Sequence, residues 1–435
     1  MVEILSRLRG DKGIWSFVAL LALFSFMPVF SASSNLAYVG QGTGNTIAYL
    51  VRHFFHIIMG FLIIYWVHRV PYHYFRGISL LALPLVWVLL AYTLFKGTVI
   101  DGANASRWLQ IPFIGISFQT STLASIVLMI YVARYLSKTR DADPTFGASF
   151  WELWVPVGIT VLLILPANFS TAALLFAMVV MLTFVGKYPL KYIGFVVGAG
   201  IIALLAFVAI AKAFPDAFPN RVDTWISRLD NFATDKPNED DYQIKNAKIA
   251  IASGMVYGLG PGKSIQKNFL PQSSSDFIYA IIVEEFGLLG GLGVLLLYLL
   301  LFFRFIVAAH KAKSMFGRLL VVGLGFPIIF QALVNMAVAV ELLPVTGQTL
   351  PLISSGGTSI WMTCVALGII IGVTKKEEEI AQELEEKEKR NQAMQRLIDA
   401  QLRREEEAEA QLAMQAAGYS ISDHSKPSNG RNEED

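Results

Sequence analysis

Cysteine and charge are both scarce in this sequence. A single cysteine, Cys364, stands among 435 residues, and charged residues make up only 16% of the chain. One cysteine leaves no internal disulfide framework and no cysteine-based metal site. Soluble domains carry about 25% charged residues, whereas 54% of the residues here are hydrophobic. This composition predicts a protein that crosses a membrane several times.

Long apolar runs occupy most of the chain up to residue 374, each near the roughly 20 residues that a membrane-spanning helix needs. There are ten, at 14–32, 50–67, 78–95, 118–136, 150–166, 171–186, 191–213, 277–303, 319–340 and 355–374. We therefore expect an all-α polytopic membrane protein, with ten transmembrane helices in a membrane domain of residues 1–376. The first run is longer than the apolar core of a signal peptide, so we expect it to remain as a span.

Lysine and arginine are distributed unevenly over the turns between these runs. Every second turn is basic, starting with Arg7, Arg9 and Lys12, whereas the short turns between them hold only Lys96 and Arg107. Basic turns of membrane proteins face the cytoplasm. We therefore expect both termini in the cytoplasm. The long segment 214–276, between spans seven and eight, is then extracytoplasmic.

The composition changes after the last span. Residues 377–418 are rich in helix formers with interleaved Glu, Lys and Arg, and residues 419–435 are polar. We expect a charged cytoplasmic helix over 377–418 and a disordered tail over 419–435. The helix is either a solvated extension or a segment that binds a partner.

The stretch "GLGPGKSIQKNFLP" (258–271) lies in the expected outer segment. Its "GPGKS" resembles a phosphate-binding loop, but Tyr257 stands where that motif requires its first glycine. The glycines either form a plain turn or expose N–H groups that could receive phosphate oxygens. Lys263 and Lys267 are four residues apart and would share one face of a helical turn. That face suits an anionic lipid headgroup or a pyrophosphate, unless the lysines simply snorkel at the interface.

Three acidic residues follow this loop. Asp276 comes after three serines at the start of span eight. There it would be either the N-cap of the helix or a carboxylate presented to a substrate at the membrane surface. The helix dipole favours its ionised form. Glu284 and Glu285 lie two to three turns deeper, where charged groups are costly and face a polar cavity or an ionic partner.

Two other outer stretches are rich in polar residues or in glycine and proline. "LPVTGQTLPLISSGGTS" (343–359) precedes span ten, and "ANASRWLQIPFIGISFQTST" (103–122) contains Arg107. Irregular backbone at a membrane edge is tolerated where it lines a cavity. We expect these two stretches and the segment around Asp276 to converge on one external polar cleft.

The histidines do not offer a competing metal site. His53 and His56 share a helical face near the outer end of span two, without acidic or cysteine partners. That setting favours interfacial packing over metal binding.

Several of these stretches resemble the signature segments of the SEDS family (shape, elongation, division and sporulation), to which FtsW and RodA belong. They are "SRWLQIPFIGISFQ", "LPQSSSDFIYAIIVEEFGLLGG" and "LPVTGQTLPLISSGGTS", in the order in which the family has them. "DYQIKNAKIAIASGMVYGLGPGKSIQKNFLP" also matches the family's loop before the acidic motif. The resemblance covers residue 14 to about residue 374.

The resemblance implies a peptidoglycan glycosyltransferase of the cytoplasmic (inner) membrane. Such enzymes polymerise lipid II, the undecaprenyl-pyrophosphate-linked disaccharide–pentapeptide, on the extracytoplasmic face. A GlcNAc 4-hydroxyl attacks the MurNAc anomeric carbon with inversion and expels the lipid pyrophosphate. The family's essential aspartate matches Asp276, which would assist the hydroxyl. The substrate-binding residues are then expected to be Arg107, Lys263, Lys267, Glu285, Ser354, Gly356 and Gly357.

The implied partners are a class B penicillin-binding protein with transpeptidase activity and other membrane proteins of the division or elongation machinery. No nucleic acid is expected. No metal site built from protein ligands is expected either, and whether a divalent cation (Mg²⁺ or Mn²⁺) takes part is left open.

The sequence also departs from the family pattern. The usual Gln-Pro-x-Glu, with a lysine three residues on, is replaced by "FQTSTLAS", which has Thr122 and Ser125 instead of the acid–base pair. Any role of that pair is therefore in doubt here. A lipid II flippase and a non-catalytic division scaffold remain as alternatives, although no internal repeat typical of transporters is visible. The charged tail and the form of "ASRWLQIPF" favour the division branch, FtsW, over RodA.

Overall fold

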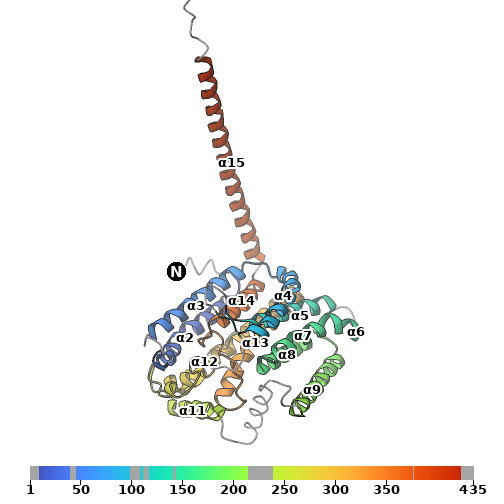
Figure 1. The fold of residues 1–435 in the computed structure, drawn as a ribbon, viewed down its shortest axis with the longest axis vertical. Helices are drawn as coiled ribbons and strands as arrows, with labels where there is room; N and C mark the ends of the chain where they lie inside the picture. The colour runs from blue at the N-terminus through green and yellow to red at the C-terminus, as the bar shows by residue number, and fades with distance from the viewer. Residues whose placement is uncertain are drawn as a thin grey trace, which may run out of the picture. The chain divides into compact units, whose positions relative to one another are not determined.

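The computed structural model describes residues 9–39, 46–97, 108–110, 117–140, 144–213, 239–375 and 377–422. The chain divides into two units, Met1–Thr374 and Lys375–Asp435. Both are built from helices (Figure 1). The helices of the first unit are α2 (Lys12–Val39), α3 (Thr46–Val67), α4 (Tyr74–Lys96), α5 (Thr120–Thr139), α6 (Phe146–Ser149), α7 (Val155–Ile164), α8 (Phe169–Val185), α9 (Leu190–Ala213), α11 (Glu239–Gly254), α12 (Ile278–Lys311), α13 (Met315–Ala339) and α14 (Thr358–Val373).

Eight helical stretches in the described part of the chain are long and apolar enough to cross a membrane. They are α2, α3, α4, α5, the continuous stretch from α6 to α7, α9, α12 and α13. Apolar runs fold as helices in a membrane because lipid offers no hydrogen bonds to backbone groups. The prediction of a helical, polytopic membrane protein is therefore confirmed. Helices α8 and α14 coincide with the sixth and tenth expected runs, but at 17 and 16 residues they are shorter than the others.

Two features were not expected from the sequence. A two-stranded antiparallel hairpin pairs β1 (Trp108–Gln110) with β2 (Ser117–Gln119). Three residues per strand are too few to show a strand pattern. A further helix, α11, lies within the segment 214–276 and packs against α12, at the lower edge of the unit in Figure 1.

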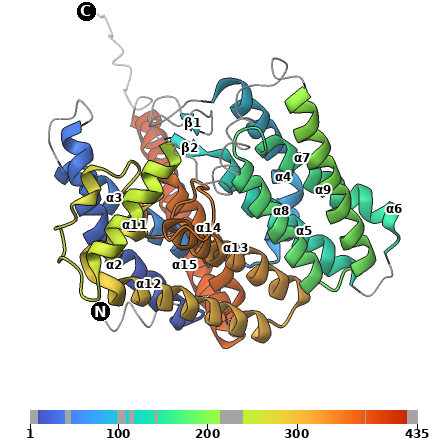
Figure 2. The same cartoon turned by 90° about the horizontal axis from the view of Figure 1, so that it is seen from below.

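Helix α13 lies at the centre of the first unit and contacts α5, α8, α12 and α14. Figure 2 shows α2, α3 and α12 on one side of α13 and α14, and α7, α8 and α9 on the other. Small residues allow close approach between helices in a membrane. A β-carbon at Gly368 would lie 2.8 Å from Cβ of Val67, and one at Gly323 would lie 2.9 Å from Cδ2 of Leu182.

Asp11, just before α2, ties three helices together at one end of the bundle. Its carboxylate forms an ion pair with Arg304, near the end of α12. Its N–H donates to Oγ1 of Thr374, which follows α14, at 2.9 Å. Helices α12 and α14 therefore run antiparallel to α2, and the start of α12 lies at the opposite end of the bundle.

Helix α12 is broken at Gly287, which has φ 69° and ψ −172°. In an intact helix the N–H groups of Leu288 and Leu289 would bond to the carbonyls of Glu284 and Glu285. Instead these two N–H groups donate to Met255 O (2.8 Å) and Val256 O (3.3 Å). These two helical bonds are thus replaced by bonds to the chain that follows α11.

The two carbonyls freed by the break are paired in the same way. Leu259 N–H donates to Glu284 O and Gly260 N–H donates to Glu285 O, both at 2.9 Å. A β-carbon at Gly258 (φ 81°) would lie 2.2 Å from Glu285 O, so no larger residue fits there. The segment 255–260 is therefore docked into the break of α12.

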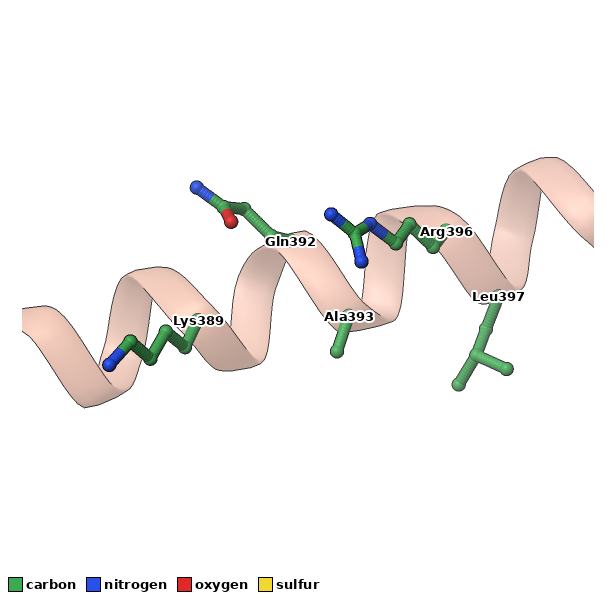
Figure 3. A pocket seen from close by; sticks show the side chains of 5 residues that line it. All are labelled: Lys389, Gln392, Ala393, Arg396 and Leu397. Atoms are coloured by element: carbon green, nitrogen blue, oxygen red, sulfur yellow. The ribbon is translucent and has the colours of Figure 1, made fainter.

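The second unit contains α15 (Glu377–Ser422), which extends four residues beyond the expected helix end at 418. The rest of the expected tail, 423–435, lies outside the described residues. Five side chains of α15 line a shallow hollow (Figure 3): Lys389, Gln392, Ala393, Arg396 and Leu397. All five come from one face of a single helix, so the hollow is a gap between exposed side chains and not an enclosed binding cavity.

Replacing Gly287 by alanine should strongly destabilise the first unit. A β-carbon there would lie 2.2 Å from Val256 O, and the positive φ disfavours any other residue. We expect Gly287→Ala to lower the free energy of unfolding by about 2 kcal/mol or more. Thermal unfolding in detergent would measure this. Gly293→Ala, in the same helix with open space around it, is the control. Equal stability of the two variants would contradict the packing described here.

Candidate active site

Asp276 lies in a turn of residues 271–277 that leads into α12, and it is half-buried. The helix begins at Ile278, and its N-cap position is Phe277, which makes no side-chain capping bond. Asp276 precedes the N-cap by one residue. The interpretation of Asp276 as the N-cap is therefore wrong.

Asn335 of α13 holds the backbone of Asp276. Its side-chain amide donates to the carbonyl oxygens of Asp276 and Gln348, each at 2.7 Å. Asn335 is 1% exposed, so these two bonds are made away from water. One buried amide thus joins the Asp276 turn, α13 and the segment before α14.

Ser354 and Ser355 hold the two residues before Asp276. Ser354 Oγ donates to Ser275 O at 2.6 Å, and Ser355 N–H donates to Ser274 O at 2.9 Å. Ser354 is 2% exposed. Its predicted place beside Asp276 is observed, but its hydroxyl is engaged with the protein backbone.

The segment that carries these serines is itself fixed. Ser354 Oγ accepts from Leu350 N–H at 2.7 Å, and the hydroxyl of Tyr298 in α12 donates to Pro351 O. Leu352 has φ 66°, and Gln272 in the Asp276 turn has φ 59°. Non-glycine residues at positive φ cost about 1–3 kcal/mol each and cluster at functional sites. Five non-glycine residues of the described chain have positive φ, and these two of them lie in the segments that meet at Asp276.

The third predicted stretch also reaches this region. Thr358 Oγ1 donates to Ser117 O of β2 at 2.8 Å, next to Gly357, which is the N-cap of α14 with φ 52°. Gly356 precedes it in the same half-exposed turn. The three stretches are therefore joined by hydrogen bonds, and the expected external cleft between them stays a prediction. Arg107 lies outside the described residues, one position before β1.

The two lysines are not equivalent. Residues Gln266–Asn268 form a single 3₁₀ turn, and Lys263 lies in the loop before it, so the expected shared helical face is not present. Lys263 is exposed. Lys267 is half-buried, and its Nζ donates to Gly262 O at 2.9 Å and to Ser31 Oγ of α2 at 3.3 Å. Lys263 is therefore the better placed of the two to meet a ligand.

Glu284 and Glu285 are both fully buried. Glu284 Oε1 accepts from Ile265 N–H (3.0 Å) and Gln266 N–H (3.2 Å), and Oε2 accepts from Ser264 Oγ. Glu285 Oε1 accepts from Ser264 N–H at 3.3 Å and from Ser31 Oγ. All of these partners belong to the protein itself, and Glu285 has no exposed surface. The expected binding of substrate by Glu285 therefore does not fit its position.

The glycine-rich loop is also used internally. The N–H groups of Gly258 and Gly260 donate to Gly254 O and Glu285 O, and are thus not available to phosphate oxygens. From the sequence we considered a plain turn and a phosphate-binding loop for these glycines. The structure shows a third role, in which the loop docks into the break of α12.

The two hydroxyl residues in place of the family's acid–base pair bond to their own helix. Thr122 Oγ1 donates to Gln119 O at 2.7 Å and Ser125 Oγ donates to Ser121 O at 2.9 Å. They therefore do not replace a link to another helix. His53 Nε2 lies 2.8 Å from the buried Ser25 Oγ, which agrees with its predicted packing role.

The sequence motifs did not point to Asn335 and Tyr298, which support the Asp276 region from α13 and α12. The available signal was one amide or hydroxyl within an otherwise apolar run, since such a group needs a partner in a membrane. Within the described ranges, no three His, Cys, Asp or Glu side chains group together as metal ligands. A divalent cation at Asp276 would fit the way Mg²⁺ is often held, by one or two carboxylates with substrate phosphates.

Comparisons with known proteins agree with this architecture. The model of the FtsW/RodA/SpoVE family, described as cell cycle proteins, matches residues 11–379. A protein of Thioalkalivibrio sulfidiphilus named "Probable peptidoglycan glycosyltransferase FtsW" is 31% identical over 85% of this chain and 90% of its own length. A protein of Nitrosococcus halophilus with the same name is 32% identical over 82% of this chain and 90% of its own.

Solved structures show the same fold. One, described as "Structural coordination of polymerization and crosslinking by a peptidoglycan synthase complex", aligns with a TM-score of 0.63 at 25% identity, over 84% of this chain and 97% of that one. The rod shape determining protein RodA of Thermus thermophilus aligns with a TM-score of 0.58 at 24% identity, over 85% of this chain and 98% of its own. The resemblance seen in the sequence is confirmed, and the chain belongs to the FtsW/RodA/SpoVE family.

Proposed function

We propose that this chain is a peptidoglycan glycosyltransferase that polymerises lipid II into glycan strands. The observation that carries the proposal is the placement of Asp276. A half-buried carboxylate sits in a turn whose backbone is held by Asn335 and Ser354, from two other parts of the chain. Such fixed placement is what a group that assists a reaction needs. The names of the relatives support the same activity.

The proposed topology has ten spans with Asp276 on the extracytoplasmic side. Helices α8 and α14 then complete the set as short spans. Asp11, Arg304 and Thr374 meet at one end of the bundle, and the expected cytoplasmic turns are basic at that end. The start of α12, with Asp276, is at the other end. The segment 214–276 would then be extracytoplasmic, and both termini of the chain cytoplasmic.

In the proposed reaction, Asp276 orients the GlcNAc 4-hydroxyl and accepts its proton. The hydroxyl oxygen bonds to the MurNAc anomeric carbon while the bond from that carbon to the lipid pyrophosphate breaks, with inversion. The electron pair leaves with the pyrophosphate. Two basic residues would stabilise the negative charge that develops on the pyrophosphate. They are Lys263 and Arg107, the residue before β1.

A lipid II flippase is the main alternative. The break in α12 is a feature that transporters also use, since freed backbone groups of broken helices bind their substrates and ions. Here, however, the four groups freed at Gly287 are all paired with residues 255–260. The break therefore serves to attach the segment 255–260, and these backbone groups are not left for a transported substrate. This favours the enzyme over the flippase. A third candidate is a division scaffold without catalytic activity. The polymerisation assay described below separates it from the enzyme, because a scaffold would make no polymer.

The proposed partner is a class B penicillin-binding protein. One structural neighbour is described as a peptidoglycan synthase complex in which polymerisation and crosslinking are coordinated. The FtsW names of the relatives support a role in division, together with other membrane proteins of that machinery. The exposed helix α15 is a candidate for binding a cytoplasmic partner.

Asp276→Ala should abolish polymerisation. The variant removes the proton acceptor while Asn335 still binds the backbone carbonyl at that position, so folding and partner binding should persist. Purified protein with its penicillin-binding protein and labelled lipid II, analysed for polymer, would measure the effect. Polymer at near wild-type levels would remove Asp276 from the proposed chemistry.

Lys263→Ala should reduce use of lipid II with little effect on stability, because the lysine is exposed. Lys267→Ala should lower the thermal stability as well, because its ammonium group bonds to Gly262 O and Ser31 Oγ. Initial rates over a range of lipid II concentrations, with melting temperatures, would separate the two. Unchanged kinetics for Lys263→Ala would show that this lysine does not meet the pyrophosphate.

Truncation after Lys376 should leave polymerisation by the purified complex nearly intact. The tail would lie across a hydrocarbon core of roughly 30 Å from the proposed site. Lys375 and Lys376 are kept because basic residues hold the orientation of the last span. Loss of activity in a well-folded truncated complex would make α15 part of the enzyme.

A further inference from the structure

The piece of α12 nearest to Asp276 is not held by helix continuity. The break at Gly287 separates Ile278–Phe286 from the rest of α12, and Asp276 lies only two residues before that piece. Two backbone bonds, from Leu259 and Gly260 to the carbonyls of Glu284 and Glu285, fix its far end, and the bonds from Leu288 and Leu289 attach the rest of α12 to Met255 and Val256. The position of Asp276 therefore depends on the attachment of the loop after α11 as well as on the bonds from Asn335 and Ser354.

Glu284 extends this attachment beyond residue 260. Its carboxylate lies on the detached piece and accepts hydrogen bonds from Ser264 Oγ, Ile265 N–H and Gln266 N–H. An ionised carboxylate only accepts hydrogen bonds, and all three partners are donors. Three consecutive loop residues are thus bound to one buried side chain.

Glu285 connects the same loop to a third element. It accepts from Ser264 N–H and from Ser31 Oγ of α2, and Lys267 Nζ donates to that same serine oxygen at 3.3 Å. Lys267 thus supplies a positive charge near the carboxylate of Glu285. The loop is fixed between α12 and α2.

The Asp276 turn is the continuation of this loop. Leu270, which is 3% exposed, packs in a small core with Phe277, Ile281 and Ala247 of α11. A loop held at residues 255–267 and again at Leu270 leaves little freedom to residues 271–277. Release of the first attachment would therefore be transmitted to the turn.

We propose that Glu284 is a positioning residue for Asp276: it locks the loop 255–267 onto the detached piece of α12 and so keeps the Asp276 turn in place. The role of Asp276 in catalysis is the proposed function on which this inference rests. Glu284 has no exposed surface, so it acts through the loop and not on the substrate. Its contribution comes from accepting hydrogen bonds.

Hydrogen exchange of the full-length protein in detergent tests the structural part of the proposal. Loss of buried hydrogen-bond acceptors leaves donors unpaired and opens the segment locally. We expect Glu284→Ala to speed amide exchange at least about tenfold in residues 259–266 and also in 272–277. Ile265→Ala is the matched control, because that side chain is 57% exposed and its N–H remains. Unchanged exchange over 272–277 in Glu284→Ala would overturn the proposal.

Activity assays with Glu284→Gln test the positioning role. Glutamine keeps one acceptor for the two N–H groups and can donate to Ser264 Oγ, so it should keep most of the loop protection and most of kcat. Glu284→Ala should lower kcat at least about tenfold with little change in KM. If Glu284→Gln is as inactive as Glu284→Ala while its loop stays protected, the charge matters and the proposal is wrong.

Ser264→Ala covers the case in which Glu284→Ala fails to fold. It removes one donor to Glu284 and should produce the same pattern with a smaller effect; no change in exchange over 272–277 would again count against the proposal. An inactive wild-type complex with the expected exchange pattern would instead reject the proposed function and leave the positioning of the turn established.

Discussion

The exchange of backbone hydrogen bonds at Gly287 is the constraint on which the rest of the region around Asp276 depends. The break frees the N–H groups of Leu288 and Leu289 and the carbonyls of Glu284 and Glu285, and each is costly if left unpaired in a site without water. Here the segment 255–260 pairs all four. The glycine-rich loop and the broken helix therefore stabilise one another, and neither arrangement would be expected alone.

Attachment of this loop determines how the residues around Asp276 are arranged. The loop brings Ser264 to two buried glutamates, where it donates a hydrogen bond to each carboxyl group. It also leads directly into the turn that α13 and the segment before α14 hold by their side chains. A rigid site thus results from contacts between parts of the chain that are far apart in sequence, which is typical of sites that must keep a precise geometry.

Polar residues in apolar runs have different uses in this protein. Asn335 and Tyr298 bind carbonyl groups of irregular segments, whereas Thr122 and Ser125 bond within their own helix. Glu284 and Glu285 bind a loop. The cost of an ionisable group in a membrane predicts that each has a partner, but it does not say which partner. That choice requires the positions of the neighbouring helices.

The sequence by itself determined the helices and the family. Apolar runs of sufficient length can satisfy their backbone only as helices, and the long motifs around Asp276, Ser354 and Trp108 identify the relatives and the three stretches that meet. The tertiary structure decided what those stretches do. Asp276 lies before the N-cap, Lys267 turns inward, and Glu285 is closed off, because each of these outcomes depends on contacts with residues that local spacing does not reveal. The role of the stretch "GLGPGK" was hidden for the same reason: Leu259 and Gly260 donate to the carbonyls of Glu284 and Glu285, which become available only because the helix that contains them is broken.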